Sequence, residues 1–224
     1  MKTKLLTIAM TAALMLTAMT KVQAQSFDGP CLPSMHGLDD HQSAFCGSTL
    51  TQTIALSAGV NWFSTYVEIA LDDLKAALVD ALGTSATITV RSQTQNVKYN
   101  RGRWAGQLEE LDLAYMYKIE VPQDCEITLE GAPVNPEEHH VTVPANGKAW
   151  MAYPFNVETT NLANFFGTFP INEDVVRSQF QNSKYNRGRW GGSLTKLEPG
   201  KGYMYESAGT EERTFYFPSQ PSKK

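Results

Sequence analysis

The chain has few of the residues, and none of the motifs, on which most enzyme sites depend. Its 224 residues contain three cysteines and four histidines, and no G-x-S-x-G, H-E-x-x-H or phosphate-binding loop occurs. Cys125 fits an alternating strand pattern, with no histidine placed to activate it. His139 and His140 are adjacent, and neighbouring side chains on a strand point to opposite faces. The sequence therefore predicts a protein that is not an enzyme, with no cofactor and no catalytic metal.

The chain also lacks an excess of positive charge and, after its first residues, any long apolar run. Lysine and arginine together number 19 against 23 aspartates and glutamates, so the formal net charge is −4. General nucleic-acid binding needs net or clustered positive charge, and an acidic chain is a poor candidate for it. No apolar run of membrane-spanning length follows the first residues. We therefore expect no nucleic-acid partner and no membrane span.

Residues 1–24 have the pattern of a secretory signal peptide. Lys2 and Lys4 precede an apolar stretch that is broken by threonines, and residues 22–24 form a small-x-small cleavage pattern. We predict cleavage after Ala24 and export to the periplasm, the cell surface or the medium. Removal of this segment takes away three lysines and no acidic residue, so the formal net charge of −4 becomes −7. The remainder suffices for one large domain or two small ones.

Cys31 and Cys46 lie in a polar N-terminal arm, residues 25–49. In an oxidising compartment the two thiols are expected to form a disulfide that closes a loop of roughly 15 residues and contributes about 3 kcal/mol. His36 and His41 lie between them, so a zinc site is the alternative. The spacing matches no established zinc motif, and export favours the disulfide.

A seven-residue string, KYNRGRW, occurs at 98–104 and again at 184–190. In the longer segments 91–104 and 177–190, 12 of 14 positions are identical. Self-similarity at a fixed spacing is the signature of an internal repeat. The sequence therefore predicts two tandem homologous units.

The similarity continues more loosely on both sides of this segment. The four tryptophans fall two per copy at equivalent places, and Tyr115–Tyr117 aligns with Tyr203–Tyr205 if two residues are inserted. The expected boundaries are a first repeat over 50–134, a second over 135–218 and a tail over 219–224.

Each repeat is predicted to be β-rich with one helix, so the fold class is α+β with β structure predominating. Alternating runs on both sides of residues 58–59 predict two strands joined by a hairpin or a tight corner. Leucines at helical spacing predict a helix over 71–82 that ends at Gly83. The second repeat predicts a shorter helix between Thr160 as its N-cap and Gly167. Further strands are expected at TITVRSQTQ, YMYKIEV and CEITLEG.

This order of a Gly-x-Asn-Trp strand, a helix, the RSQ-x-QN-x-KYNRGRW segment and a Tyr-Met-Tyr strand resembles a tandem Trp/Gly β-repeat module. The module occurs in exported and surface proteins of Bacteroides-type bacteria, commonly beside adhesin-like domains. The resemblance covers nearly all of the chain from about residue 50. It implies a non-enzymatic secreted or surface module.

The near-identity of the repeated segments has two interpretations. In the first, the tryptophans fill the core, Gly102 and Gly188 supply the positive φ of a hairpin turn that Asn100 and Asn186 tolerate, and polar side chains bond backbone groups. In the second, each loop presents aromatic and cationic side chains to a glycan or a surface protein, and two linked sites raise the avidity.

The candidate ligand contacts are Lys98, Tyr99, Arg101, Arg103, Trp104, Lys184, Tyr185, Arg187, Arg189 and Trp190. Exposure separates the two interpretations. Arginines that pair with acids such as Glu109, Glu110 or Glu198 would favour the structural one.

Overall fold

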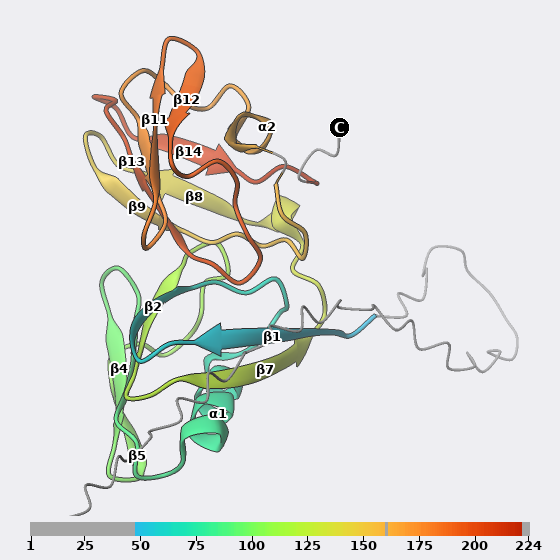
Figure 1. Cartoon of the computed structure of the whole chain (residues 1–224), viewed down its shortest axis with the longest axis vertical. Helices are drawn as coiled ribbons and strands as arrows, with labels where there is room; N and C mark the ends of the chain where they lie inside the picture. Colours follow the sequence, from blue (N-terminus) through green and yellow to red (C-terminus); the bar gives the residue numbers. More distant parts are fainter. Residues whose placement is uncertain (1–47, 160, 221–224) are drawn as a thin grey trace, which may run out of the picture. The chain divides into compact units, whose positions relative to one another are not determined.

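Antiparallel strands make up most of the part of the chain that the computed structural model describes, residues 48–159 and 161–220 (Figure 1). Within these residues, fourteen strands form four antiparallel sheets, accompanied by two α-helices and one short 3-10 helix. The prediction of a predominantly β fold is therefore confirmed.

In the N-terminal half, which we define as residues 50–134, one five-stranded sheet has the order β2-β6-β3-β4-β5 and one two-stranded sheet pairs β1 with β7. The strands are β1 (Leu50–Leu56), β2 (Gly59–Phe63), β3 (Ile88–Arg91), β4 (Asn96–Asn100), β5 (Arg103–Gly106), β6 (Tyr117–Val121) and β7 (Cys125–Gly131).

The C-terminal half, residues 135–218, has a five-stranded sheet of order β9-β13-β10-β11-β12 and a two-stranded sheet that pairs β8 with β14. Its strands are β8 (His140–Val143), β9 (Lys148–Met151), β10 (Val175–Arg177), β11 (Asn182–Asn186), β12 (Arg189–Gly192), β13 (Tyr203–Glu206) and β14 (Arg213–Tyr216). The 3-10 helix η1 (Pro136–Glu138) precedes β8. Strand for strand, the order is that of the N-terminal half.

The register of the strands corrects one detail of the sequence alignment. Tyr117 pairs with Phe63 on β2, and Tyr203 pairs with Met151 on β9. The hydroxyl of each tyrosine accepts a hydrogen bond from the backbone N–H five residues earlier, at 2.6 and 2.7 Å. Tyr117 is therefore the counterpart of Tyr203, and the expected two-residue insertion is wrong. By the same count, Lys201 is the counterpart of Tyr115.

The segment around residues 58–59 is a corner and not a hairpin. Strand β1 pairs with β7, whereas β2 pairs with β6, so the chain changes sheets between them. Gly59 has a φ of 97°, and the Asn61 side chain accepts from Ser57 N at 3.0 Å and donates to Ser57 O at 2.7 Å. These local bonds hold the corner.

The first helix follows its sequence pattern. Helix α1 (Leu71–Leu82) buries Leu71, Leu74 and Leu78 and ends at Gly83, as predicted. The Asp73 carboxylate caps the N-terminus of the helix by accepting a hydrogen bond from Ala70 N at 2.9 Å.

The second helix is shorter and begins with a different cap. Helix α2 (Leu162–Phe166) ends at Gly167, as expected. Its N-cap is Asn161, whose side-chain oxygen accepts from Asn164 N at 2.8 Å. Thr160, the predicted cap, lies outside the described residues.

Each half has a separate hydrophobic core. The first is mostly aliphatic and gathers α1 with the inner faces of the strands, including Ile88 and Ile119. The second is rich in aromatic rings, among them Tyr153, Phe166 and Phe215. The described residues nevertheless cluster as one compact unit, so the two cores belong to one body.

Several predictions concern residues outside the described part. The signal peptide over 1–24, most of the arm over 25–49, the Cys31–Cys46 disulfide and its zinc alternative with His36 and His41 all fall there. Cys125 has a free thiol and packs, partly buried, against the first core. Burial, with a smaller contribution from the charge of Asp124, raises the pKa of that thiol. None of the described helices has the length and apolar character to cross a membrane.

Candidate functional site

The repeated KYNRGRW segments form two equivalent β-hairpins. In the first, Asn100 pairs with Arg103, which leaves a two-residue turn. Both turn residues have positive φ, 52° for Arg101 and 81° for Gly102. This is the geometry of a type I′ turn, whose twist matches that of the flanking strands. The second turn residue with positive φ, besides Gly102, is therefore Arg101. The sequence had indicated Asn100 for this conformation.

The second hairpin repeats this geometry. Arg187 has a φ of 49° and Gly188 a φ of 80°. Asn186 pairs with Arg189, as Asn100 does with Arg103. Its turn has one additional support, because Arg187 N donates to the side-chain oxygen of Asn172 at 2.9 Å.

Alanine in place of Gly102 is expected to lower the free energy of unfolding by about 1 kcal/mol. A Cβ at this position would meet no heavy atom within 4 Å, so the loss comes from the backbone alone. Gly106→Ala should lose at least about 2 kcal/mol, because its Cβ would lie 2.2 Å from Asn96 O. Urea unfolding of the two variants measures both losses, and equal losses would contradict this turn assignment.

The four aromatic candidates lie on the core side of the hairpins. Tyr99 is buried, and its ring centroid is 5.1 Å from that of the half-buried Trp104. Tyr185 and Trp190 repeat the pair at 5.3 Å, and Trp190 also contacts Phe166. Such cross-strand aromatic pairs stabilise a hairpin by packing. The fold therefore accounts for these residues in both copies.

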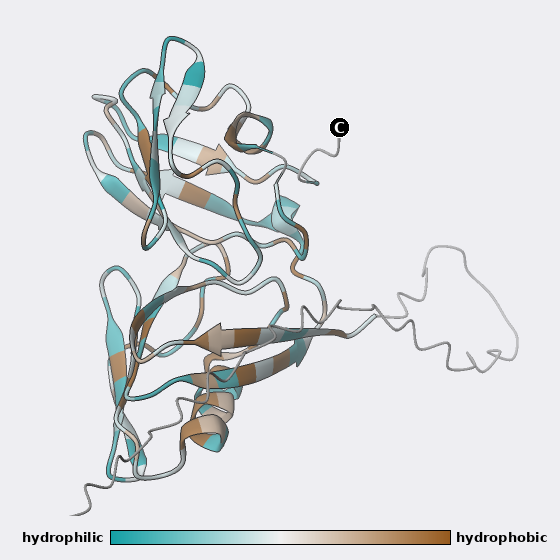
Figure 2. Cartoon of the chain, viewed as in Figure 1, coloured by the Kyte–Doolittle hydropathy of each residue, from teal (hydrophilic) through white to brown (hydrophobic). Residues whose placement is uncertain are grey.

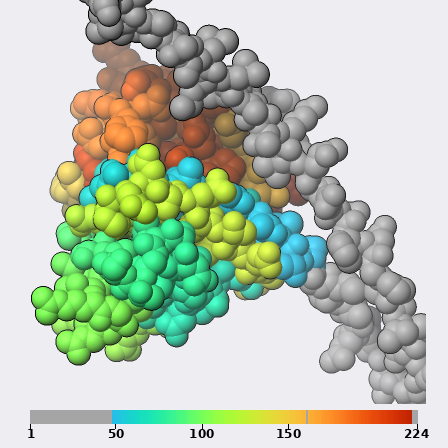
Figure 3. All heavy atoms as spheres, turned by 60° about the horizontal axis from the view of Figure 1, so that its bottom comes forward, coloured from blue at the N-terminus to red at the C-terminus, as the bar shows by residue number. Residues whose placement is uncertain are grey.

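The cationic candidates lie on the opposite side. Lys98 and Arg103 occupy exposed positions that alternate with Tyr99 and Trp104, and Arg101 stands at the turn. The second hairpin places Lys184, Arg187 and Arg189 in the same way. Figure 2 shows hydrophilic colouring at both hairpins, and Figure 3 shows the first one at the surface of the N-terminal half.

Among the described residues, the guanidinium groups of the hairpins have no acidic partner. Across residues 48–159 and 161–220, no ion pair or hydrogen bond is formed by the side chains of the four arginines, which are Arg101, Arg103, Arg187 and Arg189. Lys184 pairs with Glu173. The acids that the sequence offered as partners, Glu109, Glu110 and Glu198, do not pair with these arginines.

The first arginine of each repeated segment behaves differently. Arg91 lies 3.5 Å from Glu120, and Arg177 lies 2.7 Å from Glu206. The hydrogen bond from Arg177 is the main reason that the pKa of Glu206 lies below its ordinary value. These arginines therefore form cross-strand pairs within their sheets, in contrast with the four at the hairpins.

The first glutamine of each segment joins the two halves. Gln93 donates to Lys148 O at 2.9 Å and accepts from Trp150 N at 3.0 Å. Gln179 donates to Val60 O at 2.6 Å and accepts from Trp62 N at 3.1 Å. Each side chain thus covers the free edge of the outermost strand of the opposite half. We call this reciprocal pair the glutamine clasp.

A cation lies between two tryptophans beside the clasp. The Lys118 ammonium is 4.8 Å from the ring centroid of Trp62 and 4.4 Å from that of Trp150. Burial, and then the charge of Arg91, lowers the pKa of Lys118. Met204 occupies the corresponding place in the C-terminal half, where the lysine is therefore replaced by an uncharged side chain.

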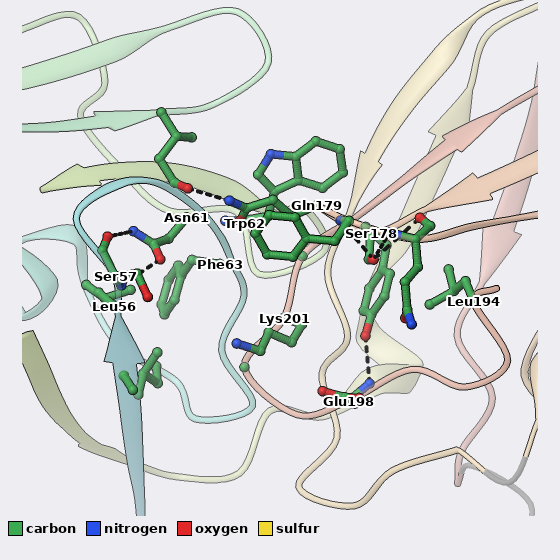
Figure 4. A pocket seen from close by; sticks show the side chains of 18 of the residues that line it. Leu56, Ser57, Asn61, Trp62, Phe63, Ser178, Gln179, Leu194, Glu198 and Lys201 are labelled. Atoms are coloured by element: carbon green, nitrogen blue, oxygen red, sulfur yellow. Dashed lines mark hydrogen bonds between the residues drawn. The ribbon is translucent and has the colours of Figure 1, made fainter. Parts of the chain in front are cut away.

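A pocket of about 660 Å³ lies against the β1–β2 corner (Figure 4). One wall comes from the corner and includes Leu56 and Asn61, and the other comes from loops that carry Gln179 and Lys201. We call this the corner pocket. Phe180 also lines it and is 88% exposed, which is unusual for so large an apolar side chain. The walls of the pocket are more than 100 residues apart in the sequence, so no local sequence pattern indicates it.

Neither site offers an evident place for a metal. No group of three or more histidine, cysteine, aspartate or glutamate side chains with suitable geometry occurs in the described part of the chain. What the two sites provide is cationic surface at the hairpins and a partly aromatic hollow at the corner. No protein-family model, no curated protein and no solved structure matches this chain.

Proposed function

We propose that this protein is an exported, non-enzymatic binding module built from two copies of one β-rich unit. Its two hairpins bind an acidic, polyhydroxylated glycan. The identical strand order of the two halves, with equivalent pairs such as Tyr99–Trp104 and Tyr185–Trp190, supports the duplication.

One observation carries the binding proposal: two hairpins of equal geometry present arginines that the fold does not use. Tyr99, Trp104 and their counterparts pack, and Gln93 and Gln179 clasp the opposite halves. Within the described residues, the side chains of the hairpin arginines form no ion pair or hydrogen bond. Arginine is also an unfavourable choice at the first turn position, where φ is positive and asparagine or glycine is preferred.

Guanidinium groups suit carboxylate and sulfate because their paired N–H donors match two oxygens at once. The contacts are solvent-exposed and individually weak. Both hairpins belong to one compact body, so a polymer that reaches both gains avidity without any new contact. An acidic glycan supplies repeated charges of this kind.

A surface protein with an acidic patch is the alternative ligand, and a module that only spaces other domains is the alternative role. The clasp and the aromatic pairs favour the second alternative, because they explain a large part of the repeated segment by folding alone. They do not explain the four arginines.

The test compares wild type with a variant in which the four hairpin arginines are changed to glutamine. On an array of neutral, uronate-bearing and sulfated glycans, wild type should bind acidic members and lose affinity as salt rises. The variant should bind at least about tenfold more weakly, since several charge-assisted contacts are lost. A matched control removes four positive charges elsewhere, through Lys75→Gln, Lys148→Gln, Lys196→Gln and Lys201→Gln.

The control should retain the binding of wild type. Equal loss in both variants would assign the effect to net charge, and binding of neutral glycans only would contradict the proposal.

A further inference from the structure

At the place in the other half that corresponds to the corner pocket, the Tyr115 side chain lies against the second core and strand β8. Ala152 N donates to Ala114 O at 2.9 Å, which brings the loop that carries Tyr115 against the C-terminal half. The Tyr115 ring packs against the second core. Its hydroxyl accepts a hydrogen bond from the backbone N–H of Thr142 on β8, at 3.4 Å.

The corner pocket has the same backbone hydrogen bond between the halves, but no tyrosine ring follows it. Ser64 N donates to Gly200 O at 3.2 Å, as Ala152 N does to Ala114 O. The next residue is Lys201, which is exposed and has no ring to fill the space. It lines a hollow where Tyr115 is packed in the other half.

The backbone donor to the Tyr115 hydroxyl, Thr142 N, has an equivalent in the wall of the corner pocket. Strand β1 holds the place of β8, and Ala55 pairs with Glu126 on β7 as Thr142 pairs with Thr214 on β14. Thr51 O on the same strand accepts from the Tyr66 hydroxyl at 3.3 Å, which places its backbone on the side away from β7, and by the two-residue period of a strand we expect Ala55 N–H to face the same way. Ala55 lines the corner pocket.

We propose that the corner pocket binds a phenol ring, with the ring against the β1–β2 corner and its hydroxyl accepting from Ala55 N–H. This site is separate from the hairpins and goes beyond the proposed function. The ligand is a 4-hydroxyphenyl group, carried either by a tyrosine side chain or by a free phenol. A volume of about 660 Å³ is in the usual range for small ligands and leaves room for the group that bears the ring.

The rim supports an aromatic ligand. Trp62 and the exposed Phe180 both line the pocket, and aromatic rings gain from offset or edge contacts with such side chains. In the N-terminal half the residue equivalent to Phe180 is Thr94, and the equivalent place there contains the protein's own Tyr115. An exposed phenylalanine therefore occurs on the side where the ring is missing.

The test is a titration of the full chain with 4-methylphenol and with N-acetyl-tyrosinamide, followed by the amide resonances of residues 54–57. Both ligands should shift Ala55. Toluene and N-acetyl-phenylalaninamide should bind about fivefold more weakly, the size expected when one hydrogen bond is lost. Tighter binding of the tyrosine amide would identify a peptide source, and tighter binding of the methylphenol a small-molecule source.

Lys201→Tyr is the decisive variant, because it restores the residue found in the other half. It should close the pocket, reduce phenol binding at least about tenfold and raise the melting temperature by a few degrees. Phe180→Thr changes only the rim and should weaken binding about threefold while leaving the melting temperature unchanged. Undiminished binding to Lys201→Tyr, or no shift of Ala55 in wild type, would overturn the proposal.

Discussion

Replacing Asp174 by alanine is expected to lower the free energy of unfolding by about 3–5 kcal/mol. Asp174 is fully buried in the C-terminal half. Its carboxylate accepts from the Tyr205 hydroxyl at 2.6 Å, from Arg213 at 2.8 Å, and from the backbone N–H groups of Ile171 and Ala208. Truncation leaves all four donors without this partner, and one of them is a largely buried cation. Urea denaturation measures the loss.

Asn in place of Asp174 is the matched control, because it keeps the shape and one acceptor but removes the charge. Its loss should be smaller than that of the alanine variant. A loss below about 1 kcal/mol for the alanine variant itself would contradict the assigned role of the network.

The same carboxylate predicts a pH dependence. Burial raises the pKa of Asp174, but the hydrogen bonds from Ile171, Tyr205, Arg213 and Ala208 outweigh burial, so the pKa lies below its ordinary value. The stabilisation is therefore fully present above the unfolded pKa and is lost as pH falls through the folded pKa. The stability difference between wild type and Asp174→Asn should shrink in strong acid. A difference that grows on acidification would contradict this sign.

The double replacement of Gln93 and Gln179 by alanine has the second largest expected effect, a loss of about 2–4 kcal/mol. Four hydrogen bonds between the halves disappear, and each contributes about 0.5–1.5 kcal/mol. The lower part of the summed range is expected because the glutamines are exposed. Thermal or urea unfolding measures the loss.

The repeated segment supplies its own control for the clasp. Gln95 and Gln181 lie two residues further on and are equally exposed, and no hydrogen bond of their side-chain amides occurs in the described part of the chain. Their double replacement by alanine should change the stability by no more than about 0.5 kcal/mol. Equal losses in the two double variants would show that the clasp does not hold the halves together.

Local patterns in the sequence predicted local structure well. Leucine spacing and Gly83 located α1, because an amphipathic helix leaves its period in the sequence. The strand expected at TITVRSQTQ is present as β3, which buries Ile88 and Val90. The turn glycines were predicted correctly. The other positive-φ residue of the turn is Arg101, whereas the sequence indicated Asn100, because asparagine adopts positive φ more often than arginine.

Long-range pairing was beyond local reasoning. Strand β1 pairs with β7, with paired residues 69 to 81 positions apart, and no pattern within either strand indicates its partner. The network around Asp174, Tyr205 and Arg213 was equally hidden, since the N-terminal half holds other residues at these positions. These are Ile88, Ile119 and Cys125.

An incorrect alignment of two identical tripeptides hid the difference between the halves at the corner pocket. Tyr-Met-Tyr at 115–117 resembles Tyr-Met-Tyr at 203–205, but the hydrogen-bond register makes Tyr117 the counterpart of Tyr203. The difference between Tyr115 and Lys201 becomes visible only in that register.

We propose that the repeated segments divide their residues between two tasks. Gln93, Gln179 and the aromatic pairs hold the fold, and the arginines bind the ligand. The most direct test is thermal melting of wild type and the four-arginine glutamine variant, each with and without a bound acidic glycan. We predict that the two proteins melt within about 2 °C of each other without glycan, and that the glycan stabilises wild type alone. A variant that melts several degrees lower, with no stabilisation of wild type by any acidic glycan, would show that the arginines also serve the fold.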